Sequence, residues 1–249
     1  MCSIIAFIVF GLFLGTNAYP LERIVGGGNV SIEDFPYQLS VRLHDSHICG
    51  GALIAAGYGL SAAHCFKTTA LYSVRAGSDF KDSGGTITNI TKIYVHPERS
   101  FYDYDIAILV FQNPLTFSST IQPVKLPTNN VILAPGIRGT ISGFGDTYNL
   151  QNKGSKVLRA AQVSVIDSEW CENQYQAFQI SVTEMVFCAG AEMGKITDSC
   201  HGDSGGPFVI DNVLYGLVSY GLDCGEPQYP GVYTNVAALR EFIWLNTGI

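Results

Sequence analysis

Residues 202–207 read Gly-Asp-Ser-Gly-Gly-Pro and surround the hydroxyl of Ser204 with glycines. Glycine permits backbone angles that other residues rarely adopt, so the chain can turn sharply and a substrate carbonyl can approach the main chain. Main-chain N–H groups beside such a serine can form an oxyanion hole for a negatively charged intermediate. The other interpretation is a glycine-rich surface turn, which this motif by itself would favour.

A serine hydroxyl is a poor nucleophile unless a base accepts its proton and a third group orients that base. His64 lies in Ser61-Ala62-Ala63-His64-Cys65, among small residues and beside a cysteine. Asp105 begins the apolar run 106–109, where burying an unpaired carboxylate would be costly, and pairing with His64 would remove that cost. An exposed aspartate at a strand start is the alternative, and Asp103 suits the role equally on spacing alone.

Short apolar or alternating runs, separated by Gly, Pro, Asn and Asp, predict an all-β fold to position these side chains. Convincing helical periodicity occurs only near the end, where Val236, Leu239, Phe242 and Ile243 predict an amphipathic helix packed on the body of the protein. The predicted strands are Gln38–Leu43, Ala52–Ile54, Ile106–Phe111, Ile137–Ser142, Ala161–Ile166 and Leu214–Ser219.

Composition limits the classes of function. With 249 residues, 47% of them hydrophobic, the chain can bury a large core and form one or two compact units. The proline-bearing segment 123–135 is the best candidate for a connection between two units. The net charge of -7 argues against nucleic acid as a partner, because a phosphate backbone is also negative.

The first residues have the pattern of a secretory signal. Residues 4–14 form an uncharged apolar run that is too short to span a bilayer, and small residues lead to an expected cleavage after Ala18. We therefore expect a signal peptide at 1–18 and a secreted, extracellular protein that is not held in a membrane. The sequons at Asn29 and Asn89 permit glycosylation in that compartment.

Cysteine usage agrees with an oxidising compartment. One of the 7 cysteines, Cys2, lies within the expected signal, and an even number in a secreted chain indicates disulfides. Six cysteines allow about 15 pairings, and spacing does not choose among them. The remaining cysteines are Cys49, Cys65, Cys171, Cys188, Cys200 and Cys224.

Taken in order along the chain, these segments resemble the trypsin and chymotrypsin family of serine proteases. The resemblance covers nearly the whole chain after the expected signal and implies two six-stranded antiparallel β-barrels with the active site between them. It places the peptidase domain at 24–249. The motifs that carry it are Ile24-Val25-Gly26-Gly27, Cys49-Gly50-Gly51, Ala62-Ala63-His64-Cys65, Asp105-Ile106-Ala107, Gly143-Phe144-Gly145, Gly202–Pro207 and Pro230-Gly231-Val232-Tyr233.

The resemblance implies how the candidate residues would act. Ser204 attacks the scissile carbonyl, His64 accepts its proton, and Asp105, supported by Ser219, holds the imidazole. The N–H groups of Gly202 and Ser204 form the oxyanion hole. No cofactor and no metal is required, and the expected partners are protein or peptide substrates and protein protease inhibitors. We expect a monomer with a digestive role.

The family also has a primary specificity pocket. Its floor corresponds to Asp198, six positions before Ser204, and a carboxylate there favours Arg or Lys before the scissile bond. Gly221 and Gly231 correspond to the pocket walls and would leave room for a long basic side chain.

Three residues near this pocket depart from the family pattern. Tyr220 stands where tryptophan is usual, and Asp223 and His201 stand at rim positions where glycine and glutamine are common. We hypothesise that Asp223 adds attraction for basic substrates or changes the balance between Arg and Lys.

Activation by cleavage is a further implication of the resemblance. Residues 19–23 would be a propeptide, and cutting Arg23–Ile24 would free an ammonium that inserts beside Asp203 and orders the site. His47 matches a family position linked to the inactive precursor. The implied disulfides are Cys49–Cys65, Cys171–Cys188 and Cys200–Cys224.

Other interpretations compete with an active protease. A catalytically dead homologue could serve as a binding protein, but it would be favoured by loss of a triad residue, and all three are present. A non-hydrolytic secreted β module explains the disulfides but not the ordered triad. His44 and His47 have metal-like spacing without further ligands, and segment 76–87 has only Asp79 and Asp82 as carboxylates, which argues against a calcium site.

Overall fold

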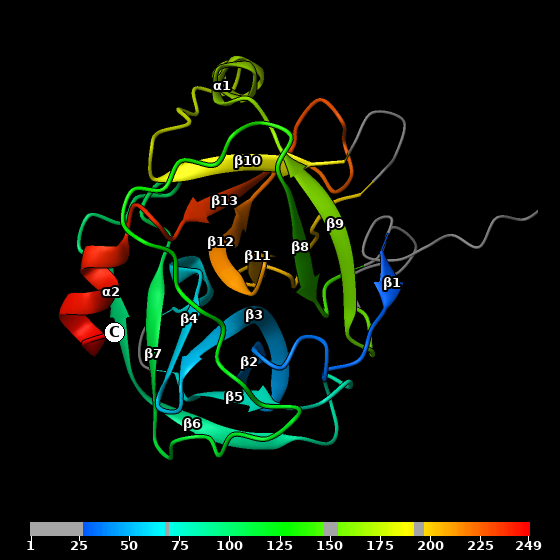
Figure 1. Ribbon diagram of the computed structural model, residues 1–249, viewed down its shortest axis with the longest axis vertical. Coiled ribbons are helices and arrows are strands. Elements are labelled where there is room, and N and C mark those ends of the chain that lie inside the picture. The colour runs from blue at the N-terminus through cyan, green and yellow to red at the C-terminus, as the bar shows by residue number, and fades with distance from the viewer. Residues whose placement is uncertain (1–26, 68–69, 147–153, 192–196) are drawn as a thin grey trace, which may run out of the picture.

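The computed structural model describes residues 27–67, 70–146, 154–191 and 197–249, which form two β-barrels stacked on one another (Figure 1). The expected signal and propeptide, with Arg23 and Ile24, lie outside the described residues. No helix in the described part of the chain is long and apolar enough to cross a membrane.

The first barrel is closed by six antiparallel strands in the order β2-β3-β4-β7-β6-β5. Closure leaves no free edge, and side chains such as Leu39, Leu60 and Ile108 fill the interior with no exposed surface. The strands are β2 (Gln38–Leu43), β3 (Ser46–Ala55), β4 (Tyr58–Ser61), β5 (Tyr72–Ala76), β6 (Thr86–Val95) and β7 (Ala107–Phe111).

The second barrel has six antiparallel strands in the order β8-β9-β10-β13-β12-β11, closed by the pairing of β11 with β8. A short strand, β1 (Gly28–Asn29), pairs with β9 at Arg159 and Ala160. Phe208 and Tyr233 are fully buried in the core of the second barrel. The strands are β8 (Arg138–Gly143), β9 (Arg159–Val165), β10 (Val186–Gly190), β11 (Pro207–Ile210), β12 (Val213–Tyr220) and β13 (Gly231–Asn235). The predicted pair of six-stranded barrels is thereby confirmed.

The closing helix is shorter than its sequence pattern. α2 (Arg240–Thr247) includes Phe242 and Ile243, whereas Val236 and Leu239 are buried in the turn that precedes it. The helix packs against the first barrel, although it follows a strand of the second (Figure 1). It therefore ties the two barrels together.

A second helix was not predicted. α1 (Ser168–Gln176) begins after Asp167, whose carboxylate accepts a hydrogen bond from Trp170 N at 2.9 Å. Only Cys171 and Tyr175 of this helix are buried, so its apolar pattern is too sparse to reveal a helix.

The segment between β7 and β8 contacts both barrels. Val124 N donates to Leu53 O in the first barrel at 2.9 Å, and Leu214 N in the second donates to Lys125 O at 2.8 Å. The barrels also meet directly, because the buried Ser142 hydroxyl donates to Gln38 Oε1 at 2.7 Å. These contacts fix the side chains of one barrel relative to those of the other.

Candidate active site

His64 and Asp105 are joined by two hydrogen bonds. His64 Nδ1 lies 2.6 Å from Asp105 Oδ2, and the main-chain N–H of His64 donates to Asp105 Oδ1 at 2.8 Å. Because a carboxylate only accepts, Nδ1 carries the proton and Nε2 of a neutral imidazole has a free lone pair. Nε2 is thus the nitrogen able to accept a proton from a serine hydroxyl.

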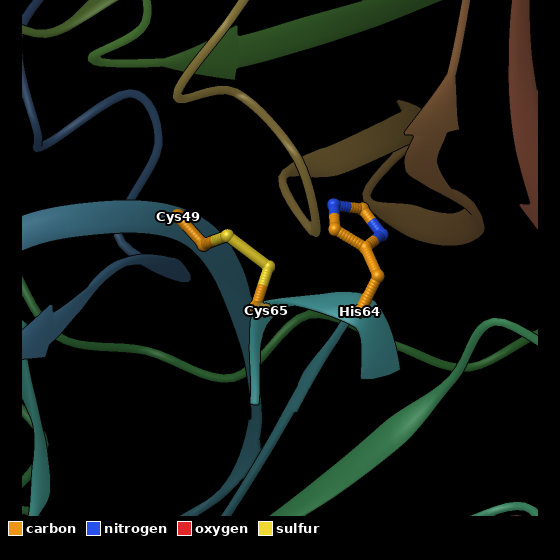
Figure 2. Close-up of side chains that lie close together, drawn as sticks. All are labelled: Cys49, His64 and Cys65. Carbon is orange, nitrogen blue, oxygen red and sulfur yellow. A yellow bond between two sulfur atoms is a disulfide. The ribbon is translucent and has the colours of Figure 1, made fainter. Parts of the chain in front are cut away.

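The main chain around His64 is a short 3-10 helix, η1 (Ala63–Cys65), directly after β4. A disulfide joins Cys65 to Cys49 in β3, which fixes η1 to the wall of the first barrel. Figure 2 shows the disulfide beside the imidazole of His64. The main chain that carries the imidazole is therefore fixed on both sides, by β4 and by the disulfide.

Cys49, His64 and Cys65 form the one cluster of potential metal ligands found among the described residues. Their ligand atoms lie within 4.8 Å of one another, but the sulfur atoms of Cys49 and Cys65 are bonded together. A metal requires thiolates, so the oxidised pair does not provide these ligands.

Asp105 is 2% exposed and is held from the second barrel as well as the first. Ser219 Oγ, on β12, donates to Asp105 Oδ2 at 2.7 Å, and Thr234 Oγ1, on β13, donates to the main-chain carbonyl of Asp105 at 2.9 Å. Burial would raise the pKa of Asp105, but the hydrogen bond and charge of His64, together with the Ser219 bond, outweigh it and hold that pKa below its ordinary value. Asp105 is therefore a carboxylate at neutral pH.

Asp103, the other candidate on spacing, points elsewhere. Its carboxylate accepts a hydrogen bond from Thr183 Oγ1 at 2.6 Å. The geometry thus distinguishes the two aspartates, which the sequence alone left open.

Ser204 lies in a turn that is anchored to both barrels. Gly50 N, in β3, donates to Ser204 O at 2.8 Å, and Gly205 N donates to Val218 O at 2.7 Å. A Cβ on Gly205 would lie 2.1 Å from Ser61 Oγ, and the φ of 77° at this residue is unfavourable for other residue types. The turn can therefore approach β4 and η1 closely only because residue 205 is glycine.

Asp203 is a buried carboxylate directly before the serine. Gly145 N donates to its Oδ1 at 2.8 Å and Cys200 N to its Oδ2 at 3.1 Å. Burial raises the pKa of Asp203 to about 6, although these two N–H donors act in the opposite direction. A cation placed beside it would favour the ionised form.

His47 contacts the same turn from the first barrel. Its Nε2 lies 3.0 Å from Gly202 O and its Nδ1 lies 2.8 Å from Ser40 Oγ. Burial lowers the pKa of His47 to about 4, so the ring is neutral at pH 7. The carbonyl only accepts, hence Nε2 donates to Gly202 and Nδ1 accepts from Ser40. His47 thereby holds the carbonyl of Gly202 and not the carboxylate of Asp203.

A cavity of about 150 Å³ opens beside Ser204. Asp198 lines it and is 4% exposed, with Ser199 N donating to its Oδ1 at 2.8 Å and Gly225 N to its Oδ2 at 3.0 Å. Burial raises the pKa of Asp198 to about 7 against the effect of those donors. No ion pair of Asp198 is found among the described residues, so a cationic side chain entering the cavity would supply a counter-charge.

Gly221 and Gly231 both line the cavity. A Cβ on Gly231 would lie 2.8 Å from Asp198 Oδ1, whereas a Cβ on Gly221 would approach no atom closer than 3.8 Å. The disulfide between Cys200 and Cys224 also borders the cavity. The third disulfide of the expected set, Cys171–Cys188, joins α1 to β10.

The three unusual residues all border this cavity. Tyr220 packs edge-on against Tyr102, with ring centroids 5.2 Å apart, and against Tyr175 at 6.0 Å. Asp223 is exposed and accepts a hydrogen bond from Cys224 N at 2.8 Å, and His201 is exposed. The substrate side of the cavity is therefore aromatic on one flank and acidic at its rim.

Sequence reasoning missed the residues that hold the site from behind. The Thr234 hydroxyl donates to the main-chain carbonyl of Asp105, and Gly50 N donates to that of Ser204. Arg99 Nε lies 3.9 Å from the Asp105 carboxylate. The only hint of Thr234 in the sequence is that it directly follows the Pro-Gly-Val-Tyr motif at 230–233. Spacing along the chain carries no signal for contacts between the two barrels.

Comparison with known proteins agrees with this geometry. A sequence model described as Trypsin matches residues 24–243. The chain is 40% identical over 225 residues to Trypsin 5G1 of Aedes aegypti, covering 89% of this chain and 84% of that protein. It is 37% identical over 252 residues to hypodermin-A of Hypoderma lineatum, covering 99% and 96%.

Solved structures give the same result. Neuropsin, a serine protease expressed in the limbic system of mouse brain, superimposes with a TM-score of 0.78 at 32% identity, over 87% of this chain and 96% of that one. Sequence, fold and comparisons agree that this chain belongs to the trypsin family and is a trypsin-like serine endopeptidase.

Proposed function

We propose that this endopeptidase cleaves peptide bonds after Arg or Lys. The observation that carries the proposal is the buried carboxylate of Asp198 in the cavity beside Ser204, where it accepts hydrogen bonds from the main-chain N–H groups of Ser199 and Gly225. An Arg or Lys side chain reaching this depth would gain a charge-assisted hydrogen bond, whereas an apolar side chain would leave Asp198 without a counter-charge.

In the proposed reaction, Ser204 attacks the scissile carbonyl while Nε2 of His64 accepts the hydroxyl proton. Asp105 keeps that nitrogen free by accepting from Nδ1, and it stabilises the imidazolium that forms. The N–H groups of Gly202 and Ser204 stabilise the oxyanion. His64 then protonates the leaving amine, and water releases the acyl group from Ser204 by the reverse steps.

We further propose that the protein is made as a secreted zymogen. Residues 1–18 would be removed as a signal and 19–23 as a propeptide, leaving a monomeric peptidase domain at 24–249. Asp203 supports this part of the proposal, because its burial calls for a cation and a new ammonium at Ile24 would provide one. Digestion of protein is the role that we assign to it, and protein inhibitors of proteases would bind the same cleft.

Turnover of matched peptides tests the proposal. The chain, cleaved after Arg23, is incubated with four peptides that differ only in Arg, Lys, Phe or Ala before the scissile bond. We expect kcat/KM for the Arg and Lys peptides to exceed that for the Phe and Ala peptides by at least about 100-fold.

Two variants control for contaminating proteases and for activation. Ser204→Ala should hydrolyse none of the peptides, and Arg23→Gln, which resists cleavage, should remain inactive. A wild type that turns over no peptide faster than Ser204→Ala would instead indicate a homologue that acts only by binding. Equal turnover of the Arg and Phe peptides would refute the role of Asp198.

A further inference from the structure

Arg99 places a positive charge beside the Asp105 carboxylate. Its Nε lies 3.9 Å from Asp105 Oδ1, which exceeds the range of about 2.7 to 3.2 Å for an N–H···O hydrogen bond. The side chain of Asp105 is 3% exposed and that of Arg99 is 34% exposed. The contact is therefore an interaction between charges at the border of the buried site.

The loop between β6 and β7 brings the two residues together. Arg99 N donates to His96 O at 3.1 Å, which forms a turn directly after β6. The chain then returns through Tyr104, which has a φ of 53° and stacks on His96 with ring centroids 4.5 Å apart. Asp105 is the next residue after Tyr104, so the folded loop places Arg99 beside it.

The acidic groups of this loop other than Asp105 have hydrogen-bond partners of their own. The Asp103 carboxylate accepts from Thr183, and Glu98 is hydrogen-bonded to the Tyr104 hydroxyl, which raises the pKa of Tyr104. Arg99 therefore acts on Asp105 without an acidic partner placed between them.

The second barrel contributes neutral groups on the opposite side. Ser219 and Thr234 donate hydroxyl hydrogen bonds to Asp105, and burial raises the pKa of Tyr220, whose hydroxyl stays protonated at neutral pH. Within the described part of the chain, His64 is the remaining titratable group hydrogen-bonded to the carboxylate.

We propose that Arg99 is a positioning residue that acts through Asp105: its charge offsets part of the carboxylate charge and keeps His64 in the neutral, proton-accepting form at lower pH. The inference rests on the catalytic roles proposed above for His64 and Asp105. A carboxylate beside an imidazole favours the imidazolium, and a guanidinium near the same carboxylate opposes it.

The expected effect is a shift of the acidic limb of the pH profile. Partial exposure of Arg99 screens its charge, so we expect a shift of about 0.3 to 1 pH unit rather than the larger value for a fully buried pair. Removing the charge should move the limb to higher pH. Activity below neutral pH then falls, while kcat/KM on the alkaline plateau changes by less than about threefold.

The test measures the His64 ring directly, in a Ser204→Ala background that needs no substrate. Titration of the imidazole by NMR gives its midpoint in this background alone and with Arg99→Gln, Arg99→Met or Arg99→Lys. The two neutral variants should raise the midpoint, and Arg99→Lys should restore most of the original value. Arg99→Met keeps the apolar stem of the side chain and serves if Arg99→Gln fails to fold.

Lys92→Gln is the matched control, because it removes one positive charge from β6 at an exposed position where Lys92 lies over the Tyr94 ring. It should leave the midpoint unchanged. An unchanged midpoint in both neutral variants, or an equal shift in Lys92→Gln, overturns the proposal. Since this readout involves no turnover, it stays decisive even if the peptide assay contradicts the proposed function.

Discussion

The hydroxyl of Thr234 in the second barrel donates at 2.9 Å to the main-chain carbonyl of Asp105, which lies two residues before strand β7 of the first barrel. Thr234 has no exposed surface, so water does not compete for this bond. The contact fixes the peptide that carries the Asp105 carboxylate, in addition to the bond that Ser219 makes with the carboxylate itself.

Thr234→Val should therefore lower both stability and activity. The substitution keeps the shape of the side chain but leaves a buried carbonyl without its donor, at a cost of about 1 to 3 kcal/mol in the free energy of unfolding. Urea unfolding and kcat on an Arg peptide measure the two effects. Thr234→Ser, which keeps the hydroxyl, should retain most of the activity, and equal losses in both variants would mean that packing, not the hydrogen bond, matters here.

Gly145→Ala should displace the carboxylate of Asp203. A Cβ at this position would lie 2.4 Å from the carboxylate, whose burial leaves it little room to move. Because Asp203 directly precedes Ser204, we expect kcat to fall by at least about tenfold with Ser204 itself intact.

Gly57→Ala is the control for this change, since a Cβ there meets no atom within 4 Å. It should leave kcat unchanged. Wild-type kcat in Gly145→Ala would show that the Asp203 pocket tolerates displacement.

The two glycines of the specificity cavity should differ in their tolerance of a methyl group. A Cβ on Gly231 approaches Asp198 Oδ1 to 2.8 Å, but one on Gly221 remains 3.8 Å from its nearest neighbour. Gly231→Ala should therefore raise KM for Arg and Lys peptides by at least about tenfold, and Gly221→Ala by less. Steady-state kinetics on both variants decide this, and the reverse order would contradict the assigned cavity floor.

Binding of cations to the cavity should weaken as the pH falls through about 7. Burial raises the pKa of Asp198 to about 7, so the carboxyl is neutral below that pH and ionised above it. A cationic ligand binds the ionised form, so its Ki should rise by about tenfold for each pH unit below 7.

A small aromatic amidine, measured as a competitive inhibitor between pH 5 and 9, provides this readout. Its neutral amide analogue should show no comparable change. If Asp198→Asn kept the same pH dependence, another group would be responsible.

The sequence pointed to the side chains that could do chemistry more clearly than to the strands and residues that hold them in place. β2 could be predicted because its apolar residues alternate with polar ones, although the structure buries every residue of this strand except the last. His64 and Ser204 stood out because nucleophilic chemistry calls for a hydroxyl and a base, whereas residue type and spacing did not separate Asp105 from Asp103. β6 was not among the predicted strands, since polar residues interrupt its apolar ones and only Thr88 of this strand is buried. Its apolar side chains do not form a continuous run.

The residues that support the catalytic side chains could not be predicted for a different reason. Arg99 is an ordinary charged residue in a loop, and Thr234 is one of many threonines in strands. Both residues matter because they lie close to Asp105 in space. Neither their spacing along the chain nor their residue types predicts that closeness. The same applies to Gly50, whose main-chain N–H binds Ser204 O.

The hydrogen bond from Thr234 to Asp105 also bears on when the active site can be completed during synthesis of the chain. Thr234 and α2 lie within the last 16 residues, and both contact elements made much earlier in synthesis. Until these residues are made, the main-chain carbonyl of Asp105 lacks its donor and the first barrel lacks the packing of α2. The catalytic centre is therefore complete only when synthesis of the chain is nearly finished.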